Sequence, residues 1–149
     1  MPGAYLEDVL KPGQTVNPLF SFLGVKVQAV SPEEAVLRLD FREEFKQGGG
    51  MVAGGILATL ADEAMAHVVL ANLGDGRRTA TTEMNVRYFR PVQGSGLTAR
   101  ARVVHLGRSL ISTEALVLDD RGRMVAKAGG SFFVIEPKKD TAPMPGQAK

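Results

Sequence analysis

The chain contains no cysteine, and this absence excludes disulfide bonds, thiolate nucleophiles and cysteine-based zinc sites. Histidine is also scarce: His67 and His105 lie far apart and lack the carboxylate spacing of a metal site, so we predict no metal. An excess of one charge is absent too, because 18 lysines and arginines nearly balance 16 aspartates and glutamates. The net charge of +2 argues against nucleic acid as the main partner.

No hydrophobic run is long and uninterrupted enough to predict a membrane span. The longest one, residues 53–70, contains Asp62, Glu63 and His67. The first eight residues lack a basic stretch followed by an apolar one, so we expect no signal peptide. With 149 residues, 44% of them hydrophobic, the sequence predicts a single-domain soluble protein of the cytoplasm that needs no membrane partner.

Asp62 is the most informative residue, because it lies inside the apolar run 53–70, which we interpret as a buried helix. No cation lies three or four residues away on that helix, so nothing local neutralises its charge. A buried carboxylate without a partner is costly and is rarely kept for packing alone. Asp62 is therefore a candidate general base or nucleophile, the alternative being a structural acid bonded to backbone amides or to a partner subunit.

The N-terminal part of the chain predicts short elements. We expect a short amphipathic helix over residues 4–10, and a second helix that starts after Asn17-Pro18 and stops at Gly24. Two nearly alternating segments then predict strands joined by a turn, at residues 24–30 and 35–41.

The central helix is expected over about residues 54–73, ended by Gly74-Asp75-Gly76. The sequence period then changes to two residues, which indicates strands joined largely by short turns. In the first of these strands Met84, Val86 and Tyr88 share a face. A hairpin turn is expected at residues 119–122, and a bulge or bend at Gly129-Gly130. The predicted strands are residues 79–90, 97–106, 109–118 and 123–135.

This order of elements predicts the α+β class, with an antiparallel sheet and one long helix packed on its face. The helix is apolar nearly all round, which one contact face would not require. We therefore expect the sheet to wrap around the central helix and a second subunit to cover the rest of it. The predicted organisation is an N-terminal helical extension, a main domain and a disordered tail, at residues 1–19, 20–135 and 136–149.

The sequence resembles the hotdog-fold acyl-CoA thioesterases, and within them the PaaI-like group of phenylacetate degradation, over roughly residues 20–135. The most specific stretch is residues 47–64, QGGGMVAGGILATLADEA. There the family has a polar amide, a His-Gly-Gly turn and Leu-Ala-Asp within the helix. Residues 81–91, TTEMNVRYFRP, are similar to the family's next strand. The sequence departs from the family pattern at one position, where Ala53 replaces the family histidine. Some related thioesterases also lack this histidine.

The resemblance implies a role for each matching residue. Asp62 would activate water or attack the thioester carbonyl itself. The N–H of Gly54, at the positive end of the helix, would stabilise the oxyanion. Gln47 would position a carbonyl or a water. Thr81, reaching from the partner subunit, would orient the water or the acid.

Two neighbours compete with Thr81 for that role. Thr79 and Thr82 lie close by, and a shift of one residue in register changes the face to which a side chain points. On the central helix, Glu63 and His67 are four residues apart and are expected to pair on its surface.

Coenzyme A carries phosphates, so a thioesterase needs cations near its substrate tunnel. The resemblance makes Arg90, at a strand end, and Arg108-Ser109, at a turn, candidates for this contact. It also places Ala53 and Gly55 against the substrate. The remaining arginines serve equally well as solvated surface.

Together these features predict an acyl-CoA thioesterase that hydrolyses an acyl- or aryl-acyl-CoA at a dimer interface, as a homodimer at least and a homotetramer by analogy with the family. Coenzyme A enters as part of the substrate, and no other cofactor is implied. The main alternative is a non-catalytic acyl-CoA sensor on the same fold, which Ala53 favours. A hydratase or dehydratase ranks lower because residues 48–63 contain no histidine, and a purely structural dimer has no positive support.

Overall fold

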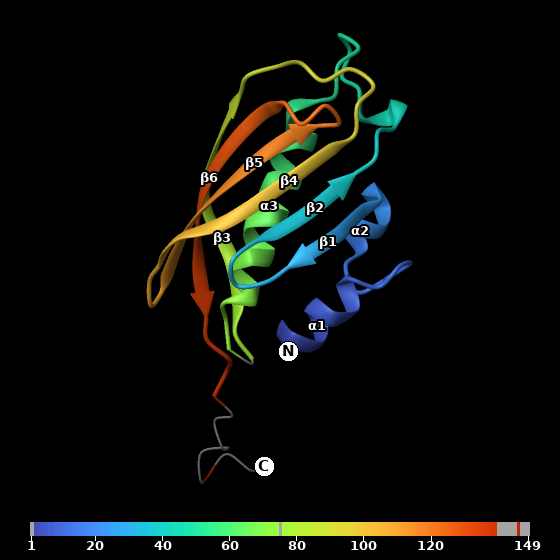
Figure 1. Cartoon of the computed structure of the whole chain (residues 1–149). Coiled ribbons are helices and arrows are strands. Elements are labelled where there is room, and N and C mark those ends of the chain that lie inside the picture. The colour runs from blue at the N-terminus through green and yellow to red at the C-terminus, as the bar shows by residue number, and fades with distance from the viewer. Residues whose placement is uncertain (1, 75, 140–145, 147–149) are drawn as a thin grey trace.

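The computed structural model describes residues 2–74, 76–139 and 146. Figure 1 shows a curved antiparallel sheet with one long helix lying along it, and two short helices from the N-terminus beside them. The elements are α1 (Pro2–Val9), α2 (Pro18–Leu23), β1 (Val25–Val30), β2 (Ala35–Leu39), η1 (Glu43–Phe45), α3 (Gly54–Ala71), β3 (Arg78–Tyr88), β4 (Leu97–Leu106), β5 (Leu110–Asp119) and β6 (Met124–Ile135).

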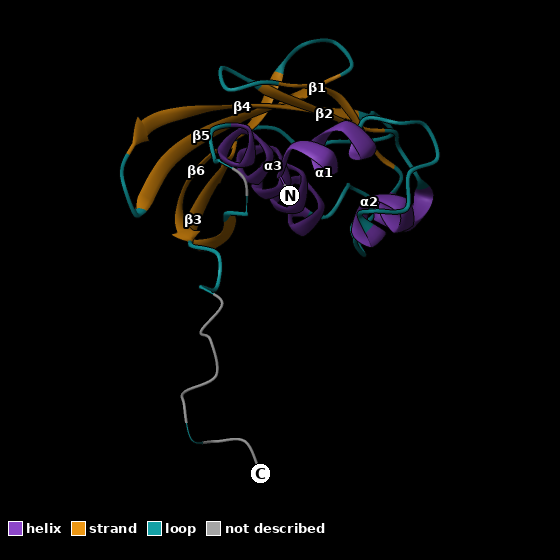
Figure 2. Ribbon diagram, turned by 90° about the horizontal axis from the view of Figure 1, so that it is seen from below, coloured by secondary structure: helices purple, strands orange, loops and turns teal. Residues whose placement is uncertain are grey.

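The sheet has six strands in the order β1-β2-β4-β5-β6-β3, and every neighbouring pair is antiparallel. Figure 2 shows the sheet curving around α3, with α1 on the side of the helix that the sheet leaves open. The predicted α+β architecture, an antiparallel sheet wrapped around one central helix, is therefore confirmed. Because β3 follows α3 in the chain but pairs with β6, it forms one edge of the sheet beside the helix.

Local signals predicted both ends of α2 and the turn between β5 and β6 correctly, whereas α1 and β2 end at Val9 and Leu39 rather than at the predicted residues 10 and 41. The Asn17 side chain accepts a hydrogen bond from the Phe20 N–H at 3.1 Å, as an N-cap does, and Pro18 begins α2. Gly24 ends α2 in the left-handed region, at φ 78°. The turn between β5 and β6 is held by Asp119, whose carboxylate accepts the backbone N–H groups of residues 121 and 123.

α3 ends two residues earlier than predicted, at Ala71 rather than residue 73. The amide of Asn72 donates to the carbonyls of Val68 and Pro32, at 2.8 and 2.9 Å, and so ties the helix end to the β1–β2 turn. The expected stop at residues 74–76 therefore lies beyond the real end, and its central residue, Asp75, lies outside the described residues.

α3 is long and apolar enough to cross a membrane by length and composition alone, a test that core helices also pass. Here it supplies the centre of the core instead. Fully buried side chains from the helix meet those from the facing strands. They include Leu60, Met65, Val68 and Val69 of α3, and Leu37, Leu97, Ile111, Val117 and Phe132 of the sheet.

At Gly129-Gly130 a bulge or a bend was predicted, and the bulge is wrong because β6 stays in register with both neighbours through these residues. Packing explains the glycine at position 130 instead. A Cβ added there would lie 3.1 Å from the Met65 Cε, so the glycine lets α3 approach the sheet closely. The strand β3 carries a bulge elsewhere, between Thr81 and Glu83.

The boundary predicted at residues 19/20 falls inside α2 and stays a prediction. The predicted disordered tail, residues 136–149, lies largely outside the described residues. Within it, residues 136–139 form neither helix nor strand.

Candidate active site

Asp62 lies midway along α3 on the stripe that the sheet does not cover, so it is half-buried rather than fully buried in the single chain. Its carboxylate oxygen Oδ1 accepts a hydrogen bond of 2.9 Å from the Thr81 hydroxyl on β3. Among the described residues no cation pairs with Asp62. This carboxylate is therefore oriented by a neutral donor, and its other oxygen remains available to a substrate or a water.

The register of β3 decides which threonine reaches Asp62. Thr81 is paired with the buried Phe132 and thus faces the helix, whereas the Thr82 hydroxyl donates to the Ser131 carbonyl at 3.0 Å. The Thr79 hydroxyl donates to the Phe133 carbonyl at 3.1 Å. Thr81 is thus placed beside Asp62, but within the same chain. The expectation that it reaches the acid from a partner subunit is corrected, because β3 borders α3 in its own chain.

The start of α3 forms a second group of predicted site residues. Ala53 occupies the N-cap position without a side-chain cap, and Gly54 is the first helical residue, so its N–H has no acceptor within the helix. The Tyr88 hydroxyl donates to the Gly54 carbonyl at 2.7 Å. A Cβ added at Gly54 would lie 3.2 Å from the Tyr88 ring, so the exposed Tyr88 side chain would have to shift by a few tenths of an ångström to admit it.

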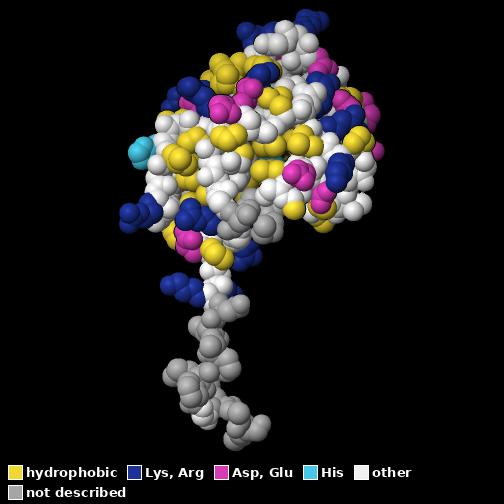
Figure 3. All heavy atoms as spheres, turned by 60° about the horizontal axis from the view of Figure 1, so that its bottom comes forward, with side chains coloured by type: hydrophobic (Ala, Val, Ile, Leu, Met, Phe, Trp, Pro, Cys, Tyr) yellow, Lys and Arg dark blue, Asp and Glu magenta, His cyan; other side chains and the backbone are white. Residues whose placement is uncertain are grey.

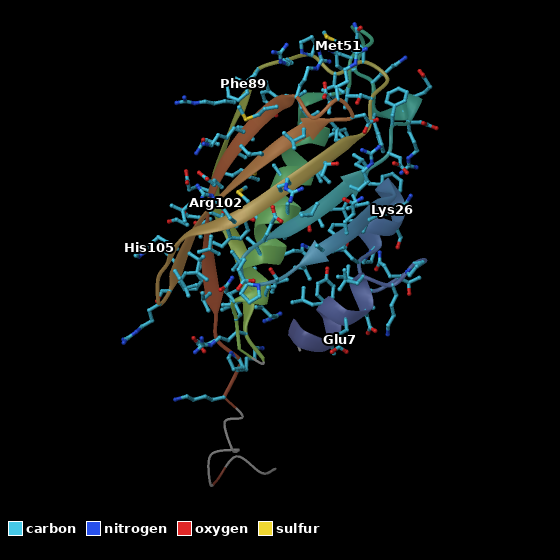
Figure 4. The ribbon with its side chains drawn as sticks, viewed as in Figure 1. Glu7, Lys26, Met51, Phe89, Arg102 and His105 are labelled. Atoms are coloured by element: carbon cyan, nitrogen blue, oxygen red, sulfur yellow. The ribbon has the colours of Figure 1, made fainter. Side chains whose placement is uncertain are left out.

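A cavity of about 280 Å³ opens at this end of the helix. It brings Gln47, Gly54 and Arg90 together, as the sequence predicts. The Gln47 side-chain oxygen accepts the N–H of Gly49 within the glycine-rich turn, and no hydrogen bond to a described residue uses its NH₂ group. Figure 4 labels Met51 and Phe89 at this end of the molecule. The lining residues are Gln47, Met51, Val52, Gly54, Leu57, Tyr88, Phe89, Arg90, Pro91 and Val92.

Other predicted site residues lie apart from this cavity in the single chain. Arg108 and Ser109 form the turn between β4 and β5, beyond His105, at the opposite end of the sheet from Met51 in Figure 4. Gly55 is exposed on the uncovered stripe of α3, and open space surrounds the position of its missing Cβ. Asp62 follows Gly54 by eight residues, which is about 12 Å along a helix. One chain therefore cannot present the Gly54 N–H and the Asp62 carboxylate to the same carbonyl group.

Sequence reasoning missed the environment of Glu63. Burial, together with the charge of Asp62, raises the pKa of Glu63 to about 7. The expected approach to His67 is present, with Nδ1 3.9 Å from the Glu63 carboxylate, but its expected place at the surface is wrong. His67 is only 2% exposed, and its Nδ1 donates to the Glu63 carbonyl at 2.6 Å. The signal was available in part, since Glu63 belongs to the same apolar run as Asp62. The residues that bury Glu63 come from the distant N-terminus of the chain.

Tyr5 of α1 is the group that closes this side of α3. Its hydroxyl lies 2.9 Å from the His67 Nε2 and accepts a hydrogen bond of the same length from the Asn17 amide. Because the His67 Nδ1 proton is used on a backbone carbonyl, Nε2 is the acceptor and Tyr5 donates to it. Burial lowers the pKa of His67, and Phe20 stacks on its ring with centroids 5.1 Å apart. His67 is thus a neutral structural residue that links α1 to α3.

Within the part of the chain that the structure describes, no cluster of three or more metal-ligating side chains occurs. The predictions of no metal and no cofactor beyond the substrate's own coenzyme A stay predictions.

Comparisons with known proteins agree with this architecture. The sequence pattern of the thioesterase superfamily matches residues 49–126. An assigned esterase of Halobacterium salinarum is 38% identical over 127 residues, which cover 78% of this chain and 83% of the relative. The 1,4-dihydroxy-2-naphthoyl-CoA hydrolase of Listeria monocytogenes is 23% identical over 117 residues, which cover 78% and 95%.

Among solved structures, a point mutant of the phenylacetic acid degradation protein PaaI from Thermus thermophilus superposes with a TM-score of 0.72. It is 30% identical, and the match covers 78% of this chain and 98% of that protein. The match to the superfamily includes the start of α3, Asp62 and Thr81. The chain therefore belongs to the thioesterase superfamily, as a PaaI-like thioester hydrolase with the hotdog fold.

Proposed function

We propose that the protein hydrolyses an acyl- or aryl-acyl-CoA to the free acid and CoA, with Asp62 as the reacting carboxylate. The observation that carries the proposal is the Thr81–Asp62 hydrogen bond on an uncovered stripe of the central helix. This bond fixes one carboxylate oxygen and leaves the other free for a water or for the thioester carbon. As a base, Asp62 takes a proton from the attacking water. As a nucleophile, it forms an anhydride that water then cleaves.

The site proposed here is completed by a second copy of the chain. Gly54 and Asp62 are too far apart on one helix to act on one thioester, so the oxyanion donor must come from another α3. Two features support a two-fold partner at this place. The strand β3 is an edge strand with mostly exposed residues, and the stripe of α3 beside it is uncovered.

Hydrophobic side chains at the surface also support assembly. Figure 3 shows them gathered among charged groups on the lower face of the molecule. The exposed large ones include Tyr88, Phe89, Val104, Leu106, Leu110 and Phe133. The homotetramer, the cytoplasmic location and the CoA contacts of Arg90, Arg108 and Ser109 stay predictions.

The substrate lies between the two chains in this proposal. Asp62 of one chain faces the thioester, while Gly54 N–H and the Gln47 amide of the other face its carbonyl oxygen. Arg90 lines the same cavity as Gly54 and could meet a phosphate of CoA at its mouth. Collapse of the tetrahedral intermediate then breaks the C–S bond and releases CoA.

The test is CoA release from a panel of short, long and aromatic acyl-CoAs by the wild type and by Asp62→Asn. Asparagine has nearly the same shape but cannot act as a base, so we expect a folded variant that has lost turnover. Asp40→Asn, which removes an exposed carboxylate from a surface ion pair, is the matched control and should keep wild-type turnover.

A non-catalytic acyl-CoA sensor is the second candidate, and the absence of the family histidine at Ala53 favours it. Binding of acyl-CoA by the wild type without release of CoA from any member of the panel would support the sensor and refute hydrolysis.

A further inference from the structure

A second carboxyl group stands beside the proposed catalytic one. Glu63 follows Asp62 on α3, and consecutive residues of an α-helix project about 100° apart. Asp62 is directed toward Thr81 on β3, whereas Glu63 lies on the side of the helix that α1 covers. Ala66, one turn after Asp62, projects about 40° from it and therefore lies between the two carboxyl groups. A substrate placed over this small residue has an acid on either side.

The surroundings of the two acids differ. Among the described residues Glu63 has no cation partner. The titratable groups that face it are Asp62 and His67 on α3 and Tyr5 on α1. The His67 Nδ1 is 3.9 Å from the Glu63 carboxylate, but this imidazole is buried and neutral, since its other nitrogen accepts the Tyr5 proton. The side chain of Glu63 remains 23% exposed, so it can still reach a ligand on the uncovered stripe.

These contacts lead to a role in the proposed hydrolysis, on which the inference rests. We propose that Glu63 is a further catalytic residue, the general acid that protonates the sulfur of the departing CoA. Asp62 takes one proton from water as the new C–O bond forms. The C–S bond then breaks, its electron pair passes to sulfur, and sulfur takes the Glu63 proton. Asp62 later loses its proton to solvent, and Glu63 regains one from solvent, which restores both groups.

The proton affinity of Glu63 suits the role of an acid. Burial and the neighbouring charge raise the pKa of Glu63 to about 7, so a large fraction of it holds a proton at neutral pH. The cysteine thiol, an alkyl thiol like that of CoA, has a pKa near 8.5, which lies above that of Glu63, so transfer of the proton to an alkyl thiolate is favourable.

Leaving-group dependence tests the proposal. Glu63→Gln is compared with the wild type on one acyl group presented as its CoA thioester and as its p-nitrothiophenyl thioester. An aryl thiolate is a much better leaving group and needs no proton to depart. We expect roughly a 10²-fold loss of kcat on the CoA thioester, and a change of less than about threefold on the aryl thioester. Glu83→Gln is the charge-matched control, because Glu83 is exposed on β3.

Each outcome has a defined meaning. Equal losses on both thioesters, or no loss on either, would overturn the role of Glu63. Asp62→Asn should lose both activities, and if the wild type cleaves neither thioester the proposed hydrolysis fails and the acid role fails with it.

The wild type supplies a second test if Glu63→Gln does not fold. Its rate on the CoA thioester should fall as pH rises above about 7, where Glu63 loses its proton, while the aryl thioester shows no such fall. Identical pH profiles for the two thioesters would refute the proposal.

Discussion

Thr81→Val removes the hydroxyl that orients Asp62 while keeping the shape and β-propensity of the side chain. The hydrogen bond between the Thr81 hydroxyl and the Asp62 carboxylate is 2.9 Å long. Bonds to charged groups contribute roughly 1.5–3 kcal/mol, but Thr81 is exposed in the single chain and water can replace part of the interaction. We therefore take about 1–1.5 kcal/mol as the loss, which corresponds to a fall of about 5- to 13-fold in kcat.

The assay is the release of CoA followed with a thiol reagent, and the absence of cysteine means that the protein itself gives no signal. Thr81→Ser keeps the hydroxyl and should retain most of the activity. Thr79→Val is the matched control, because its hydroxyl donates to a strand carbonyl and not to Asp62. The reasoning is refuted if Thr81→Val keeps wild-type kcat, or if Thr79→Val loses as much as Thr81→Val.

Four further predictions concern assembly, mechanism and stability. Gly54→Pro removes the N–H at a helical position that accepts proline. When this variant is refolded together with an equal amount of Asp62→Asn, the mixture should show about a quarter of wild-type turnover per chain, because only mixed dimers contain an intact site. If the site lay within one chain, the mixture would show no turnover. Single turnover in H₂¹⁸O should label Asp62, as seen by peptide mass spectrometry, only if this residue is the nucleophile. The folded-state pKa of Glu63, about 7, exceeds its unfolded value of 4.5. The unfolding free energy of the wild type should therefore fall by up to about 3 kcal/mol as pH rises from 4.5 to 7. In urea titrations, the unfolding free energy of Glu63→Gln should depend less on pH over this range. Tyr5→Phe leaves the buried His67 Nε2 without its donor and should lower the unfolding free energy by roughly 1–2 kcal/mol, with no change contradicting the link from α1 to α3.

The sequence predicted the architecture well because its signals were local and physically distinct. The change from a helical period to a period of two marked the boundary between α3 and β3. Asn17, Pro18 and Gly24 predicted both ends of α2 because capping depends on only a few adjacent residues. The end of α3 was harder, since Asn72 binds a carbonyl of the distant Pro32.

The candidate site was predicted in its parts but not in its grouping. Spacing and the family resemblance were enough to identify Asp62, Gly54 and Gln47 as site residues. Spacing alone did not show that they form two groups, with Gln47 and Gly54 at the start of α3 and Asp62 midway along it. The expected surface location of the Glu63–His67 pair was wrong for a related reason. Tyr5 lies 62 residues before His67 in the chain, and no pattern within the helix reveals that this distant side chain buries it.

The bulge at Thr82 has a consequence for how this strand tolerates change. After the bulge, the side chains that face the helix are even-numbered: Met84, Val86 and Tyr88. Before the bulge they are odd-numbered: Thr79 and Thr81. The bulge absorbs the extra residue, so that Thr81 still faces the helix and its hydroxyl reaches Asp62. Deleting Thr82 would leave Thr81 opposite Phe132 and Glu83 opposite Ser131, so the strand would lose its bulge and keep Thr81 facing α3. Position 82 is thus the place where this strand tolerates a deletion, whereas an insertion or deletion of one residue elsewhere in it would turn the residues on one side of the change to the opposite face.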